Sequence, residues 1–344
     1  MRPLHNIIKR VLLVGITLPN AQPVNNPPPA RLRELIAASA ASHRGCNARA
    51  IVYGNRYRSA FWSIYLLSAI AVLFAALPPA LGWDVHGHAL NGYTWLWGVA
   101  ELVVIAIVGL VYWLGERGQW QAEWLAARTE AELTWYLPLV APLIDFDAPD
   151  ASVNWYARLF DPGHHLREES NVDALCVRFE PLARSSLAGA WQDAAFLDQY
   201  ARWAISILDG QRIYHARMRA EQHALTHRVH RITGWLFALT ALGAVLHLVL
   251  HSLWLSLLAV FFPALAAALH GALAQSEAFR LEQSAARLVE SLGQAIAAVE
   301  QARALSGDGA AQALADAVQA AAAVILDEHQ DWHGTVRPHQ IPLG

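Results

Sequence analysis

Four stretches of the chain are apolar over most of their length, and they set the predicted architecture. Each is close to or above the roughly 20 residues that a membrane-crossing helix needs. None shows the amphipathic periodicity of a helix that packs on the core of a soluble protein. Pro78-Pro79 should stop or kink the first, and Pro263 lies in the fourth. We expect membrane spans over residues 61–82, 93–114, 232–250 and 253–273.

A helical pattern continues beyond the second span. Trp120, Trp124 and Trp135 recur at steps that fit one helical face, and Pro138 supplies a break. We therefore expect the second span to run into the cytosol as one long helix. A similar pattern continues the fourth span to about residue 299.

The remaining segments are predicted from the positions of their helix-breaking Pro and Gly residues. Residues 138–190 are interrupted by Pro and Gly and should form loops with short helices, whereas residues 190–230 should form a helix that leads into the third span. A helix is also expected from residue 30 to about 42, and an Ala-rich one to about 327. No strand-like alternation and no internal repeat is evident.

The predicted fold class is an all-α polytopic membrane protein, in which four transmembrane helices form two hairpins that extend into a cytosolic helical stalk. The first expected segments are a cytosolic N-terminal segment with a Pro-rich linker (1–50) and a first transmembrane hairpin (51–115). A cytosolic helical region (116–231) and a second transmembrane hairpin (232–274) follow, and the chain ends in cytosolic C-terminal helices with a tail (275–344).

Composition and charge support this prediction and orient it. The chain is 55% hydrophobic and 15% charged, against roughly 45–50% and about 25% in soluble proteins. The net charge of −3 implies no nucleic-acid partner. Positive charge stays on the cytosolic side, so both termini and the central region should face the cytosol. The arginines that flank the spans are Arg56, Arg58, Arg117, Arg228, Arg231 and Arg280.

No pattern indicates catalysis, a cofactor or a metal site. Cys46 and Cys176 are not in a CxxC pair, and no hydrolase triad, P-loop or GxGxxG stretch occurs. His247 and His251 are one helical turn apart, a spacing compatible with metal, and His270 lies in the next span. No carboxylate or cysteine joins them, so hydrogen bonding is the preferred interpretation. We expect a protein that is not an enzyme and has no cofactor.

Glu101 is the candidate pore-lining or gating residue. It lies about two turns inside the second span, where an ionisable group is expensive and indicates function by default. The alternative is a carboxyl kept neutral by burial, or hydrogen-bonded to a neighbouring helix.

A cluster of arginines before the third span is the candidate contact for a signal or for lipid. On a helix their guanidinium groups could bind a phosphorylated signal or lipid headgroups. The alternative is ordinary positive-inside anchoring on a solvated helix surface. The candidates are Arg212, Arg217, Arg219, Arg228 and Arg231.

Four stretches together resemble the prokaryotic SLATT family and related four-transmembrane effectors, which associate with SMODS nucleotidyltransferases and SLOG nucleotide-sensing domains. The resemblance covers roughly residues 50–340. The stretches are Arg56-Tyr57-Arg58-Ser59-Ala60-Phe61 with Tyr65-Leu66-Leu67, then Trp120, Trp124, Arg128, Ala131 and Glu132, then Gln211, Tyr214 and His215 leading through His230, and finally Asp331-Trp332 with Pro338.

The resemblance implies a homo-oligomeric pore or channel in the bacterial inner membrane, gated by a nucleotide second messenger or by a separate sensor protein in an antiphage system. Many relatives carry an N-terminal sensory domain, and here about fifty residues precede the first span. Direct nucleotide sensing by such a domain is therefore not expected. The alternative function is a non-conducting membrane scaffold or regulator that recruits a cytosolic partner.

Overall fold

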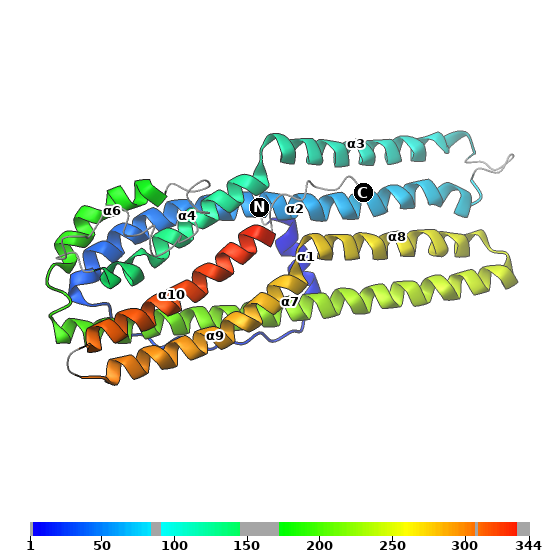
Figure 1. Cartoon of the computed structure of the whole chain (residues 1–344). Coiled ribbons are helices and arrows are strands. Elements are labelled where there is room, and N and C mark those ends of the chain that lie inside the picture. The colour runs from blue at the N-terminus through cyan, green and yellow to red at the C-terminus, as the bar shows by residue number, and fades with distance from the viewer. Residues whose placement is uncertain (1–2, 84–90, 145–171, 307–308, 336–344) are drawn as a thin grey trace.

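The computed structural model describes residues 3–83, 91–144, 172–306 and 309–335, and most of these residues lie in helices. Figure 1 shows long helices that run side by side, with a bundle of helices at one end and the apolar spans at the other. Four helices are long and apolar enough to cross a membrane. The predicted fold class is confirmed.

The first hairpin begins with one very long helix. A single 3₁₀ turn, η1 (Ala30–Leu32), leads into α2 (Arg33–Ala80), whose 48 residues extend over about 72 Å. The short helix expected from residue 30 and the first span are thus one continuous helix. Pro78 and Pro79 occupy its last turn and the helix ends there, as predicted.

The return helix, α3 (Trp95–Arg117), follows a 3₁₀ turn, η2 (Asn91–Tyr93). The prediction that it continues unbroken is wrong, because Gly118 and Gln119 separate it from α4 (Trp120–Val140). Gln119 has a left-handed backbone with φ of 43°. The Trp120 indole packs so closely beneath Gly118 that an added Cβ would lie 2.4 Å from Nε1, and only glycine leaves that space free.

The second hairpin follows the same plan. Helix α7 (Ala194–Leu250) begins where the Asp193 carboxylate accepts hydrogen bonds from the Ala195 and Phe196 amides, and it runs through the third predicted span. Helix α8 (Leu253–Gln275) returns, and α9 (Ala278–Ala304) follows. Here too the predicted continuous helix is broken, at Ser276 and Glu277, with φ of 53° at Glu277.

The two hairpins are structural repeats that the sequence does not reveal. In each, a long helix crosses the membrane, a 23-residue helix returns, and a two-residue break precedes a further helix. In both breaks the second residue is left-handed. The repeats run in the same direction along the spans (Figure 1).

The four spans lie in a row instead of enclosing a space. Helix α2 contacts both α3 and α8, and α8 contacts α7, which gives the order α3–α2–α8–α7 seen in Figure 1. The central pair meets at Gly271, where an added Cβ would lie 2.4 Å from the Tyr65 ring. Small residues allow this close approach of membrane helices. The outer helices are the most exposed, with only 11% of each apolar window buried.

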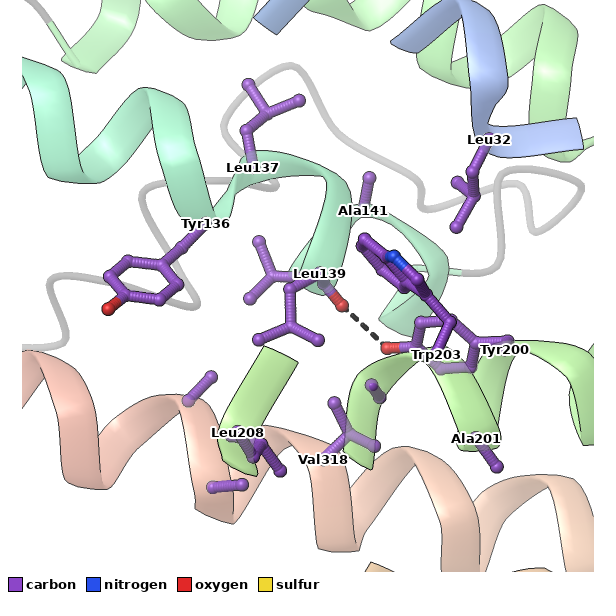
Figure 2. Close-up of a cluster of buried hydrophobic side chains, with 14 of the residues drawn as sticks. Leu32, Tyr136, Leu137, Leu139, Ala141, Tyr200, Ala201, Trp203, Leu208 and Val318 are labelled. Atoms are coloured by element: carbon purple, nitrogen blue, oxygen red, sulfur yellow. Dashed lines mark hydrogen bonds between the residues drawn. The ribbon is translucent and has the colours of Figure 1, made fainter. Parts of the chain in front are cut away.

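The other ends of the helices form a packed bundle. It consists of the first part of α2, α4, the 3₁₀ turn η3 (Ala141–Leu143), α6 (Val172–Leu187), the first part of α7, α9 and α10 (Ala310–Thr335). We call it the extramembrane bundle. Helix α10 is longer than predicted. Figure 2 shows its core, where the Tyr200 hydroxyl donates a hydrogen bond of 2.6 Å to the Leu139 carbonyl.

Helix α1 (Leu4–Leu12) packs on α2 and α7 near the start of the spans. Two sequence predictions reach beyond the described residues, namely the loops and short helices expected over 138–190, of which 145–171 is not described, and Pro338.

Candidate functional site

A cavity of about 770 Å³ lies where the spans meet the extramembrane bundle. Its walls come from α1, α2, α4, α7, α9, α10 and the α8–α9 break, so both repeats contribute. We call it the junction cavity. Its volume is within the roughly 300–1,000 Å³ of small-molecule sites.

The side of the junction cavity nearest the membrane is aromatic and tied together by one hydrogen bond. Tyr57, Phe61 and Trp62 come from α2, and Gln275 comes from the end of α8. The Gln275 side-chain amide donates to the Tyr57 hydroxyl at 2.9 Å. This bond links the two hairpins directly above the cavity.

Arg58 is the most unusual group in the junction cavity. Its guanidinium lies 4.9 Å from the centre of the Trp124 ring, but among the described residues it has neither a hydrogen bond nor an ion pair. Burial lowers the pKa of Arg58 from its usual value, and the nearby charge of Arg128 lowers it further. A half-buried cation that has lost part of its hydration and has no counter-ion is costly, so this site favours an anion.

Arg128, from α4, is in a different situation. It forms an ion pair with Glu132 one turn away. Burial disfavours its charge, but the Glu132 carboxylate more than compensates, and the pKa of Arg128 is raised overall. Glu132 is therefore paired with Arg128 and does not act as the counter-ion of Arg58.

Two buried histidines, His5 and His215, line the same cavity. Desolvation lowers the pKa of each to about 4, helped by the charge of Arg58 at His5 and of Arg128 at His215. Both are thus neutral at pH 7. The Nδ1 atom of His215 is buried without a hydrogen-bond partner, whereas the Nδ1 atom of His5 lies 3.3 Å from the Ser59 hydroxyl.

These histidines should make the protein acid-sensitive. The unfolded chain binds their protons near the ordinary pKa of 6.5, while the folded protein resists until about pH 4. Stability is therefore complete above about pH 6.5 and is lost as the pH falls towards 4. At pH 5 we expect each histidine to cost on the order of 2 kcal/mol. Thermal unfolding followed by Trp fluorescence from pH 7.5 to 4.5 measures this loss.

The matched variants are His5→Asn with His215→Gln, and the exposed His227→Gln as control. The double variant should flatten the pH dependence and the control should retain it. Equal pH dependence in all three proteins would show that the acid sensitivity has another origin.

Of the five arginines predicted to contact a signal or lipid, the structure brings only Arg217 to the junction cavity. Arg212 is paired with Asp209 at 2.7 Å. Arg228 donates to the Val14 carbonyl at 2.8 Å. Arg219 and Arg231 are exposed on α7 and do not line the cavity.

Sequence reasoning therefore missed the buried part of the site. Arg58 fitted the pattern of positive charge beside a span, which explained it without any ligand. Arg128 stood in a plain helical pattern with Glu132 at the spacing of an ordinary helix pair. The available signal was that Arg58 is flanked by Tyr57, Phe61 and Trp62, an aromatic setting unlike that of a solvated anchor.

Glu101 lies on α3, the outermost helix of the row, about 9 Å along the helix from Trp95. Its side chain is half-buried. It has no hydrogen bond or ion pair to any residue in the described part of the chain. Its role as a pore-lining or gating group, and the alternative of a neutral or hydrogen-bonded carboxyl, both stay predictions.

The span histidines make local contacts. His247 Nδ1 lies 2.8 Å from the Ser252 carbonyl, where α7 turns into α8. The His270 ring lies 5.1 Å from that of His230. Within the described ranges, no group of three or more metal-ligating side chains comes together.

Together the spans, the repeats and the junction cavity define a polytopic all-α membrane protein with a ligand-sized chamber beneath its spans. No family model, curated protein or solved structure matches the chain.

Proposed function

We propose that this protein is a membrane effector of bacterial antiphage systems, which assembles into a homo-oligomeric pore in the inner membrane and opens in response to a cytosolic signal or partner. The resemblance to SLATT-type effectors supports the defence role. The arginines at the spans support an orientation with the extramembrane bundle in the cytosol.

The observation that carries the proposal is the position of Glu101. A carboxyl on the outer helix of the row has no hydrogen bond or ion pair with any of the residues that the structure describes. In lipid it would be costly, but an oligomer around an axis would place copies of α3 about a water-filled path. Four spans in a row enclose no such path alone, so the pore needs several copies.

The continuity of two helices between the extramembrane bundle and the spans also supports a gated pore. Helices α2 and α7 run unbroken from the extramembrane bundle into the spans. A change of packing in the bundle is therefore transmitted through α2 and α7 to their apolar, membrane-spanning parts. The return helices are uncoupled from the bundle by the breaks at Gln119 and Glu277, which provide hinges.

Ion flux through reconstituted liposomes tests the proposal, and Glu101→Gln tests the residue. We expect cation flux to fall by about tenfold, because a ring of carboxylates concentrates cations at the pore. Glu116→Gln is the matched control, since Glu116 is exposed on the same helix beyond the apolar stretch.

A reconstituted protein that never conducts, with or without candidate signals, would contradict the pore and favour the non-conducting scaffold. Equal conduction by the wild type and by Glu101→Gln would support the pore but show that Glu101 neither lines nor gates it.

A further inference from the structure

We propose that the junction cavity binds a small organic phosphate that carries a flat ring, a nucleoside phosphate, with the phosphate on Arg58. The binding site is argued from the cavity alone. Its role as the trigger of opening deepens the function proposed above and rests on it.

The charge balance of the cavity calls for an anion. Its lining holds the cations Lys9, Arg58, Arg128 and Arg217 and the acids Glu132, Glu221 and Glu277. Lys9 is paired with Glu221, and Arg128 with Glu132. Arg58 and Arg217 have no ion pair within the described part of the chain, and with Glu277 counted the lysine, arginine and glutamate side chains of the lining leave one positive charge in excess.

A guanidinium suits a phosphate better than other anions of similar size. Its planar fork donates two parallel hydrogen bonds to two phosphate oxygens, and the charge assists both. Arg58 is also held in place, because its guanidinium stacks on Trp124. Trp124 itself lies against Gly54, where an added Cβ would be 2.8 Å from the indole nitrogen. The donor is therefore positioned before any ligand arrives.

The rest of the cavity suits a flat heteroaromatic ring. Tyr214 and Trp135 line it, and both side chains are exposed enough to be reached by a ligand. His215 adds a buried Nδ1 atom without a partner, which a nitrogen or exocyclic group of a base would satisfy. Asn47, Asn55 and Gln211 supply further donors and acceptors.

An occupant of this cavity would contact both hairpins at once. Gln275, which donates to Tyr57, and Glu277, the left-handed residue of the α8–α9 break, both line the cavity. Binding would thus change the packing between α2 and the start of α9, where the second return helix is hinged.

The test measures binding to the full chain in phosphatidylcholine nanodiscs by calorimetry and by thermal shift. The probes are the four ribonucleoside monophosphates, the corresponding nucleosides and inorganic phosphate. We expect at least one monophosphate to bind more tightly than both its nucleoside and inorganic phosphate. Arg58→Gln should weaken this binding by about ten- to a hundredfold, the loss expected for a charge-assisted hydrogen bond.

The controls separate binding from folding. Arg219→Gln, on the exposed face of α7, should bind as the wild type does. Arg58→Gln should melt no lower than the wild type without ligand, because it removes a desolvated cation that lies near Arg128. Arg217→Gln, a change at an exposed residue, should also weaken binding without altering folding.

Three outcomes would overturn the proposal. The first is that no monophosphate binds better than inorganic phosphate, and the second is that Arg58→Gln binds as tightly as the wild type. The third is an Arg58-dependent stabilisation by phosphatidylglycerol nanodiscs with no nucleotide effect, which would make the occupant a lipid headgroup. Binding without any effect on liposome conduction would leave the site standing and remove only its role as trigger.

Discussion

Replacing Gly271 by Leu should separate the two hairpins and give the largest loss of stability of any single change within the spans. Even a Cβ at this position would lie 2.4 Å from the Tyr65 ring. Because α2 and α8 are the central pair of the row, overpacking here forces the repeats apart. We expect a cost of about 3 kcal/mol or more and a drop in Tm of roughly 5 °C or more in nanodiscs.

The matched control is Gly109→Leu, on α3. Nothing lies within 4 Å of a Cβ built there, so the new side chain points into lipid and Tm should not change. Tyr65→Ala combined with Gly271→Leu should recover part of the loss, because the leucine then occupies the space of the ring. If Gly271→Leu melts with the wild type, α2 and α8 do not meet at this glycine.

Four helices able to span a membrane could be predicted from the sequence, because lipid requires long apolar helices and hydropathy records that requirement directly. The end of α2 at Pro78-Pro79 was predictable for the same kind of local reason. The order of the spans was not, since it depends on which small residue faces which ring, as at Gly271 and Tyr65.

The helix breaks show where local patterns fail. Gln119 and Glu277 are ordinary helix formers, and the apolar periodicity continues past both. Both residues are left-handed, and at the first break the Trp120 indole packs under Gly118, a contact that hydrophobic periodicity does not record. The repeat of the two hairpins was missed because it consists of matched lengths and hinges instead of matched residues.

The candidate site was only partly predictable. Glu101 stands out in any hydropathy profile, and the arginines before the third span stand out by density. Arg58, Arg128 and His215 come from three helices far apart in the sequence, and only packing brings them to one cavity. No spacing rule connects residues that share neither a helix nor a turn.

Replacing Tyr200 by Ala should have the largest effect outside the spans. Tyr200 is 2% exposed and lies on α7 in the core of the extramembrane bundle, with its hydroxyl directed at the Leu139 carbonyl of α4 (Figure 2). Loss of a buried aromatic ring costs about 3–5 kcal/mol. Tyr200→Phe keeps the ring but leaves the Leu139 carbonyl without its donor, which should cost about 1–3 kcal/mol.

Thermal unfolding and limited proteolysis of the three proteins, with the exposed Phe279→Ala as control, measure both steps. The order of stability should be wild type, then Tyr200→Phe, then Tyr200→Ala, with the control equal to the wild type. Because this core joins α4 to the continuous helix α7, its loss should also release the spans from the bundle. A Tyr200→Ala protein that keeps wild-type stability would show that the bundle does not hold α7 through this residue. The bundle would then have to be coupled to the spans through other contacts.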